Sequence, residues 1–318
     1  MHDFAVMLKS YLPDLEYAGR FLDSWFEFDT DSIPVYVVVP YADIDAFMLV
    51  VRGRAEIIPE SVFAEHLVDY PIHGNNAGYM NQQIIKLAFA ELHLARFYFC
   101  VDSEVVMLRP FGVEDFFAEP EIPYHFLTED AELRIEPEYY ATHWEQRVEK
   151  LLALRKYLDL PTEPLLTCHG LALFSDEVLQ SLRDFLKSRG LTYATALELC
   201  PYEFSWYNFW LEREQVIRVA QREPIIKVFH SKSQHLEYVL KGITTEDLAR
   251  GYVGVLVNAG FSRQFGVIHF DQPRHEVIGH YVRVGTMARA LLLRWIRRAP
   301  RLQALVRHLR LLSVDSKQ

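Results

Sequence analysis

Residues 33–40 place the tightest constraint on the fold of this chain. They read Ile-Pro-Val-Tyr-Val-Val-Val-Pro, a run of β-branched and aromatic residues with a proline near each end. Such residues favour extended backbone, and a run that is apolar on both faces suits a strand buried inside a layered sheet. The closing proline ends the strand because it has no N–H to donate to a neighbour. The sequence therefore predicts a sheet that is covered on both faces.

Other apolar runs alternate with helix-like stretches along the chain. This alternation predicts an α/β fold with a mainly parallel, doubly wound sheet flanked by helices. Ligands bind such sheets beyond the carboxyl ends of the strands, where the strand order switches. We expect further strands at 4–8, 56–58, 96–101, 165–174, 225–229 and 253–257, and helices at 15–26, 80–94, 144–157 and 179–187.

Composition narrows the class of protein. The 318 residues are 50% hydrophobic and 24% charged, which is enough for one large domain with a sizeable core. The three cysteines lack the CxxC spacing of a zinc cluster, and their odd number argues against a disulfide framework. A reducing, cytoplasmic location is therefore expected. The first residues do not resemble a secretory signal, and no run of eighteen apolar residues predicts a membrane span.

Charge is distributed unevenly along the chain. The formal net charge is −10, yet residues 282–312 carry eight arginines and no acid, which leaves −18 for residues 1–281. We expect a main domain over 1–280 and a basic, amphipathic helical tail over 281–318. A body this acidic argues against nucleic acid as a partner, because each neutralised phosphate needs a cation.

The tail has leucines at helical spacing among its arginines, over residues 287–312. This pattern fits a helix that lies on an anionic membrane surface and brings the protein there from the cytoplasm. It fits equally well a helix that packs on the acidic body or forms an oligomer contact.

Two carboxylates follow the strand predicted at 96–101. Asp102 and Glu104 are two residues apart, so in extended backbone both would point to one side of the strand. Paired carboxylates suit Mg²⁺ or Mn²⁺ bridging a diphosphate. Solvated acids where a strand leaves the sheet explain these residues, taken alone, equally well.

Polar residues interrupt the apolar helix that leads into this strand. Gln82 or Gln83 shares a helix face with Lys86, because residues three or four apart lie together. They would form the solvent face of the helix, or, beside a carboxylate pair, contact a sugar hydroxyl and a phosphate. His230 and Lys232 follow the strand predicted at 225–229 and would supply a metal ligand and a phosphate contact.

Several segments taken together resemble a known family. They are Lys9-Ser10-Tyr11, residues 33–40, Asn81 to Leu87, Val101 to Glu104, and Arg109-Pro110-Phe111. They resemble bacterial glycosyltransferase-like proteins of a domain-of-unknown-function family, which are similar to nucleotide-sugar transferases of the GT-A fold. The resemblance spans about residues 1–270 and is strongest over 74–111.

The resemblance implies a donor site with a metal. In the GT-A fold an Asp-x-Asp motif ends a central strand, where it holds the donor ribose and the metal on the diphosphate. Asp102 matches the first Asp, and Glu104 stands in place of the second. A late histidine completes the metal shell in related transferases, and His230 resembles it. The implied metal is Mn²⁺ or Mg²⁺, bound by Asp102, Glu104 and His230.

The resemblance also implies residues around the sugar. Similar proteins have an acid among aromatics where this chain has Glu203, which would accept the proton of the acceptor hydroxyl. An acidic first turn of a helix after Pro201 explains Glu203 equally well. His169 and Gly170 lie where such folds line the sugar pocket, although a buried strand accounts for them too. The implied donor-binding residues are Lys9, Ser10, Gln82, Gln83, Lys86, Asp102, His169, Gly170 and Lys232.

The first functional hypothesis is therefore a glycosyltransferase. It would transfer a sugar from a nucleotide-sugar donor to a glycan or lipid-linked acceptor, with metal assistance and inversion, in bacterial polysaccharide or glycoconjugate synthesis. A nucleotidyltransferase would share the sheet but needs a glycine-rich loop after the first strand, which Lys9-Ser10-Tyr11 does not provide. The alternative is a non-catalytic glycan- or nucleotide-binding module or assembly module, with Glu104 as a sign of lost chemistry.

Overall fold

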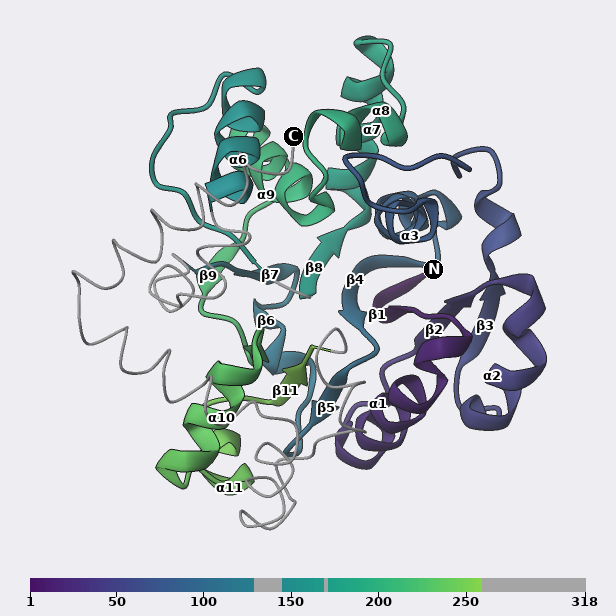
Figure 1. Ribbon diagram of the computed structural model, residues 1–318, viewed down its shortest axis with the longest axis vertical. Coiled ribbons are helices and arrows are strands. Elements are labelled where there is room, and N and C mark those ends of the chain that lie inside the picture. The colour runs from purple at the N-terminus through teal and green to yellow at the C-terminus, as the bar shows by residue number, and fades with distance from the viewer. Residues whose placement is uncertain (129–144, 169–170, 259–318) are drawn as a thin grey trace, which may run out of the picture.

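The computed structural model describes residues 1–128, 145–168 and 171–258, and its centre is a five-stranded sheet (Figure 1). The strand order is β3-β2-β1-β4-β8. The first four strands run parallel to one another, and β8 runs antiparallel to β4. The expected α/β fold with a mainly parallel sheet is confirmed. The strands are β1 (His2–Lys9), β2 (Val35–Val39), β3 (Glu56–Pro59), β4 (Ala95–Asp102) and β8 (Leu171–Ser175).

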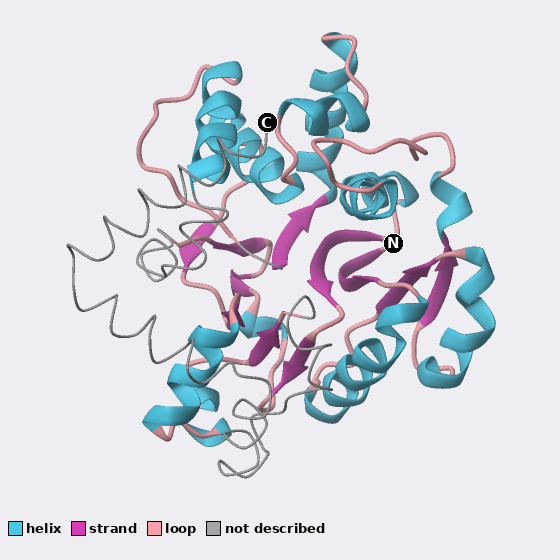
Figure 2. Ribbon diagram, in the orientation of Figure 1, coloured by secondary structure: helices cyan, strands magenta, loops and turns pink. Residues whose placement is uncertain are grey.

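Helices cover both faces of this sheet, as the run at 33–40 predicts (Figure 2). Alternate residues of a strand point to opposite faces, so Val6 and Leu8 of β1 enter one core, and Ala5 and Met7 enter the other. The first core packs under α1 (Leu15–Phe28) and α2 (Ile44–Val51). The second packs under α3 (Ala77–Ala88), α7 (Asp176–Ser188) and α9 (Glu203–Glu214).

Local sequence explains the two helices that matter most for packing and for the site. In α1 the buried residues Ala18, Phe21, Leu22 and Trp25 recur at helical spacing, which gives one apolar stripe facing the sheet. Helix α3 begins at an N-cap, because the Asn76 side chain accepts a hydrogen bond from the backbone N–H of Tyr79. The remaining α-helices are α6 (Glu145–Tyr157), α8 (Tyr193–Leu199), α10 (Lys232–Lys241) and α11 (Thr245–Ala249).

Two three-stranded sheets extend the fold beside the main one. The first has the order β10-β11-β5 and joins the late strands predicted at 225–229 and 253–257 to β5. The second has the order β6-β7-β9. The strands are β5 (Val105–Met107), β6 (Phe117–Glu119), β7 (Ile122–Phe126), β9 (Ala220–Arg222), β10 (Ile226–Phe229) and β11 (Gly254–Val257).

Several elements differ from expectation. The strand predicted at 165–174 begins only at Leu171 in β8, and α2, α8, α10 and α11 were not predicted. Short 3-10 helices also connect the main elements. They are Leu12–Asp14, Tyr41–Asp43, Glu60–Phe63, Phe89–Leu92 and Val113–Asp115. The three cysteines are free and buried, which agrees with the expected lack of a disulfide framework.

Candidate active site

The carboxyl ends of β1 and β4 form the edge at which the candidate site lies. Lys9 and Asp102, the last residues of these strands, are neighbours in the parallel register. The strand order switches here, since the chain winds from β1 towards β2 and β3 on one side and towards β4 on the other. This is the position at which open α/β sheets bind ligands.

Helix α3 carries Lys86 into this edge. The side chain is only 2% exposed, so the interpretation of this position as a solvent face is wrong. Lys86 Nζ lies 2.9 Å from Asp102 Oδ1 and 3.0 Å from Glu203 Oε1. Burial alone would lower the pKa of Lys86, but the Asp102 and Glu203 carboxylates outweigh it and hold the pKa well above its usual value. Lys86 is therefore an ammonium ion that bridges two acids.

Glu203 completes this network from the opposite side. It is the first residue of α9 and 5% exposed, so it is both the acidic first turn of a helix and part of a buried ionic group. The buried Gln83 amide, with its NH₂ turned to the carboxylate, donates to Glu203. Gln82 Nε2 lies 3.5 Å from Asp102 Oδ1, too long for a strong hydrogen bond. The structure thus brings together five predicted residues: Gln82, Gln83, Lys86, Asp102 and Glu203.

Lys9 and Ser10 lie at the same edge but differ in what they offer a ligand. Lys9 Nζ donates to the Ser10 carbonyl oxygen at 2.7 Å and lies 2.5 Å from Glu60 Oε1. Burial lowers the pKa of Lys9 in spite of Glu60. The Ser10 hydroxyl is buried, and among the described residues its Oγ has no hydrogen-bond partner. The Ser10 hydroxyl is therefore available to a ligand at this edge, whereas Lys9 already forms an ion pair with Glu60.

The backbone after Asp102 is a turn rather than an extended strand. Ser103 and Glu104 form the two-residue connection between β4 and β5. The expectation that strand alternation aims both carboxylates to one side is therefore wrong, because that periodicity ends at Asp102. After the turn the chain enters the neighbouring sheet, where β5 pairs antiparallel with β11.

That neighbouring sheet carries His230 towards the same edge. Phe229, the last residue of β10, pairs with Val257 of β11, and β11 pairs with β5 directly after Glu104. Two strand spacings, roughly 10 Å, therefore separate the backbones at His230 and Glu104. His230 is half-buried, and its backbone N–H donates to Gln234 Oε1 at 2.8 Å. Carboxylate and imidazole donors suit Mn²⁺, but among the described residues these three side chains do not converge as a preformed ligand set.

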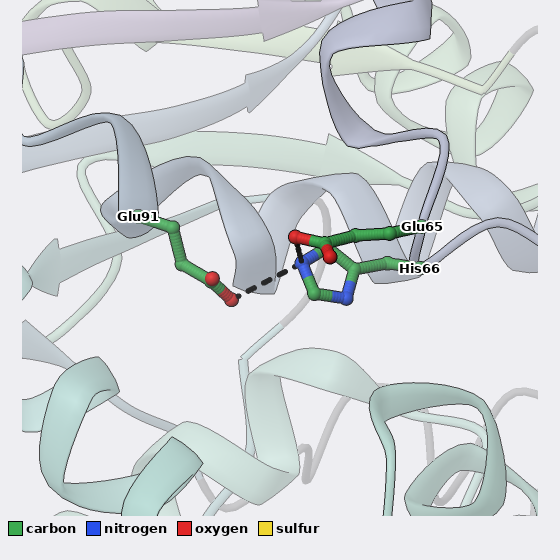
Figure 3. A group of neighbouring side chains, drawn as sticks. All are labelled: Glu65, His66 and Glu91. Atoms are coloured by element: carbon green, nitrogen blue, oxygen red, sulfur yellow. Dashed lines mark ion pairs between the residues drawn. The ribbon is translucent and has the colours of Figure 1, made fainter.

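A different set of potential metal ligands does converge, away from this edge (Figure 3). His66 Nε2 lies 3.5 Å from Glu65 Oε1 and 3.4 Å from Glu91 Oε1. Glu91 already accepts a hydrogen bond from Tyr193 and pairs with Arg183. It also precedes β4, whereas Asp102 ends it, and an eight-residue strand spans roughly 25 Å. This group lies too far from Asp102 to act on a ligand bound there.

Sequence reasoning missed Glu60 and Tyr79, and considered Phe204 only as one of the aromatic residues around Glu203. Glu60 follows β3 and forms an ion pair with Lys9 at the same edge of the sheet. The rule that ligands bind at strand ends would have identified Glu60 as a candidate. The Phe204 ring lies 4.7 Å from Lys86 Nζ, a cation–π contact. Burial and then the Glu203 carboxylate raise the pKa of Tyr79 to about 12. No spacing signal pointed to Tyr79.

Some predicted positions lie outside the described residues. They are His169, Gly170, the boundary near residue 280 and the tail over 281–318. Lys232 is the first residue of α10, and nothing further is described of its side chain.

The chain's family is identified by sequence. The family described as "Family of unknown function (DUF6492)" matches residues 20–243. The chain belongs to this family. The DUF6492 match includes the Lys86 network and His230 but begins after Lys9 and Ser10. Among curated proteins, no sequence matches the chain. Membership of a domain-of-unknown-function family is as predicted.

Solved structures with some similarity to this DUF6492 protein include two glycosyltransferases. Mouse xyloside xylosyltransferase 1, in its apo form, has 13% sequence identity and a TM-score of 0.48, over 82% of this chain and 99% of that chain. The apo structure of WbbM, a bifunctional glycosyltransferase, has 10% identity and a TM-score of 0.48, over 80% of this chain and 45% of that chain. TM-scores below 0.5 do not establish a common fold.

Proposed function

We propose that this protein is a glycosyltransferase that moves a sugar from a nucleotide-sugar donor to a glycan or lipid-linked acceptor. The observation that carries the proposal is the buried Lys86, which joins Asp102 and Glu203 at the switch in strand order. Buried ionic groups cost desolvation energy and are weak contributors to stability, so a cluster of three at a ligand-binding edge favours a functional role.

The donor would lie across the ends of β1 and β4. Asp102 and the uncommitted Ser10 hydroxyl offer acceptors and a donor for the nucleotide, and Gln82 adds an amide. Gln83 and Lys86 would contact the sugar or its phosphate. Lys9 would hold Ser10 in place through the carbonyl contact. His169, Gly170 and Lys232 remain proposed donor-binding positions by resemblance to GT-A transferases.

A divalent cation would be held by Asp102, Glu104 and His230. The carboxylates would favour Mn²⁺ or Mg²⁺. The assignment is supported by the two strand spacings that separate Glu104 and His230 across β5, β11 and β10. When bound, the cation neutralises the charge that develops on the leaving phosphate. Asp102 keeps contact with Lys86 and so links this position to the sugar side of the site.

Glu203 would act as the base on the acceptor side. The acceptor oxygen attacks the anomeric carbon, the bond from that carbon to the phosphate oxygen breaks, and the acceptor proton passes to Glu203. The nucleotide leaves with the bonding electron pair, and a single displacement inverts the anomeric centre. Lys86 and Gln83 hold the Glu203 carboxylate in position for this step.

Membrane association would come from the basic segment 287–312, at the cytoplasmic surface of an anionic bilayer. Within the described residues, no helix is long and apolar enough to cross a membrane. Association with a lipid-linked acceptor would depend on surface contacts made by segment 287–312.

Nucleotide binding and turnover test the proposal together. Thermal shift with UDP, GDP, CMP and the corresponding sugar nucleotides, each with Mn²⁺, Mg²⁺ or EDTA, should give stabilisation by at least one nucleotide that depends on metal. Release of free sugar from that donor should then be detectable. The matched variant Asp102→Asn should lose both signals. A stabilising nucleotide without any turnover would favour the non-catalytic binding module, and no shift with any nucleotide would reject both.

A further inference from the structure

A second polar site lies along α9, outside the Lys86 network. It is a cavity of about 530 Å³ between α9 and the strands β7 and β9. That volume lies within the range of small-ligand pockets. Its wall combines apolar side chains such as Ile217 with polar ones such as His125, Asn208 and Gln221.

The cavity shares helix α9 with the proposed catalytic edge. Glu203 is the first residue of α9, and Asn208 follows five residues later, roughly 7.5 Å along the helix axis. Asn208 Nδ2 donates to Cys168 Sγ at 3.2 Å. Cys168 comes shortly before β8, whose first residue pairs with Val101, the neighbour of Asp102. Helix α9 thus contributes to both the cavity and the Lys86 network, with Asn208 roughly 140° around the helix axis from Glu203.

A hydrogen bond determines which ring nitrogen of His125 carries the proton. His125 Nε2 lies 2.9 Å from Asn208 Oδ1. The amide oxygen only accepts, so Nε2 carries the proton. Burial lowers the pKa of His125, which keeps the ring neutral and leaves Nδ1 as an acceptor for a hydroxyl. Asn208 uses both ends of its amide to hold this arrangement and acts as a positioning residue.

The cavity wall carries one carboxylate, Glu212, and one arginine, Arg218. Glu212 forms an ion pair with Arg155, whose two terminal nitrogens lie 2.7 and 2.8 Å from the Glu212 oxygens. Arg218, also in the wall, has no acidic partner among the described residues. Its guanidinium can bind a carboxylate through two parallel hydrogen bonds.

We propose that this cavity binds a saccharide that carries a carboxylate, such as a uronate or sialate unit, with the carboxylate at Arg218 and hydroxyls at His125 and Gln221. Apolar side chains such as Ile217 pack on the C–H face of the sugar. The assignment of this saccharide as the acceptor rests on the proposed transferase function. Binding itself does not, because it needs only the cavity.

An array of immobilised oligosaccharides, half neutral and half with uronate or sialate units, tests the proposal with the full chain. The wild-type protein should be retained by acidic members and not by the neutral ones. Arg218→Gln should weaken retention about ten-fold or more, as expected for loss of a charged hydrogen-bonded pair. Gln221→Trp, which fills the cavity from β9, should abolish it.

Two matched controls separate site effects from general ones. Arg250→Gln removes the same charge from α11's C-terminal end, and Glu119→Trp adds the same ring to an exposed position of β6 in the same sheet as β9. Both should retain acidic glycans as the wild type does. Retention of neutral glycans only, no retention at all, or equal retention by Gln221→Trp would overturn the proposal.

Nucleotide thermal shifts on the same proteins distinguish this proposal from the proposed function. Glycan retention without any nucleotide shift would keep the saccharide site and reject the transferase. A nucleotide shift without glycan retention would keep the transferase and reject the saccharide site.

Discussion

Lys86 Nζ lies 3.0 Å from Glu203 Oε1, although 117 positions separate the two residues in sequence. The contact joins α3 to the start of α9, and the Asp102 contact of Lys86 joins both helices to the end of β4. Three elements thus meet through one buried ammonium. This relationship makes the ionic network a single unit, and the effects of substitutions within it should not add.

Lys86→Met should destabilise the protein strongly. Removal of the cation leaves two carboxylates close together in a buried setting, a change that typically costs about 3–5 kcal/mol. Urea unfolding measures the loss. The double variant Lys86→Met/Glu203→Gln should lose less than the two single variants combined, because it removes one of the uncompensated charges. Strict additivity would show that the network is not a unit.

Asp102→Ala and Glu104→Ala should each abolish sugar transfer while the fold remains intact. Both residues lie at the carboxyl end of β4, where the donor diphosphate is proposed to bind. Circular dichroism checks the fold, and thermal shift with the stabilising nucleotide checks binding. Near-native activity and nucleotide affinity in Asp102→Ala would mean that the donor binds elsewhere.

Glu203→Gln should lower kcat strongly and spare donor affinity. The amide keeps the size of the side chain but does not accept the acceptor proton. Single-turnover kinetics with a saturating donor separates the chemical step from binding. An unchanged kcat would instead support a retaining mechanism or a purely structural role for this acidic first turn.

His235 should make the protein sensitive to acid. Its side chain is fully buried, and burial lowers its pKa to about 4 from a usual value of 6.5. The unfolded chain therefore binds more protons than the folded one between these values. The free energy of unfolding should be flat above about pH 6.5 and fall as the pH drops towards 4, by an amount on the order of 3 kcal/mol. His235→Phe should reduce this slope, as measured by urea unfolding at pH 7 and pH 5.

Truncation after Gly285 should abolish binding to anionic vesicles. The removed segment holds seven arginines and the leucines at helical spacing. Flotation with phosphatidylserine-containing and neutral vesicles measures binding, and only the anionic set should carry the full-length chain. If the full-length chain fails to float with either set, the membrane role of the tail is wrong.

The sequence by itself determined the fold class and much of the site. The buried run at 33–40 and its alternation with helices predicted the sheet, because β-branched runs and apolar periodicity act locally. The helix that carries Lys86 leads directly into the strand that ends at Asp102, and one of the two interpretations of Lys86 placed it beside the carboxylates. That contact is present at 2.9 Å.

Only the tertiary structure decided which charged side chains are buried and which partners they contact. The sequence offered Lys86 as either a solvent-face residue or a site residue, and burial against α9 settled this because Glu203 and Phe204 cover it. β5, which follows the Ser103–Glu104 turn, pairs with a strand about 150 residues later, and no local pattern encodes this pairing. The state of Lys9 likewise depends on Glu60, which only packing of β3 near β1 brings within reach. Local sequence preferences thus determine the helices and strands, and long-range contacts determine which of their side chains are buried or form ion pairs.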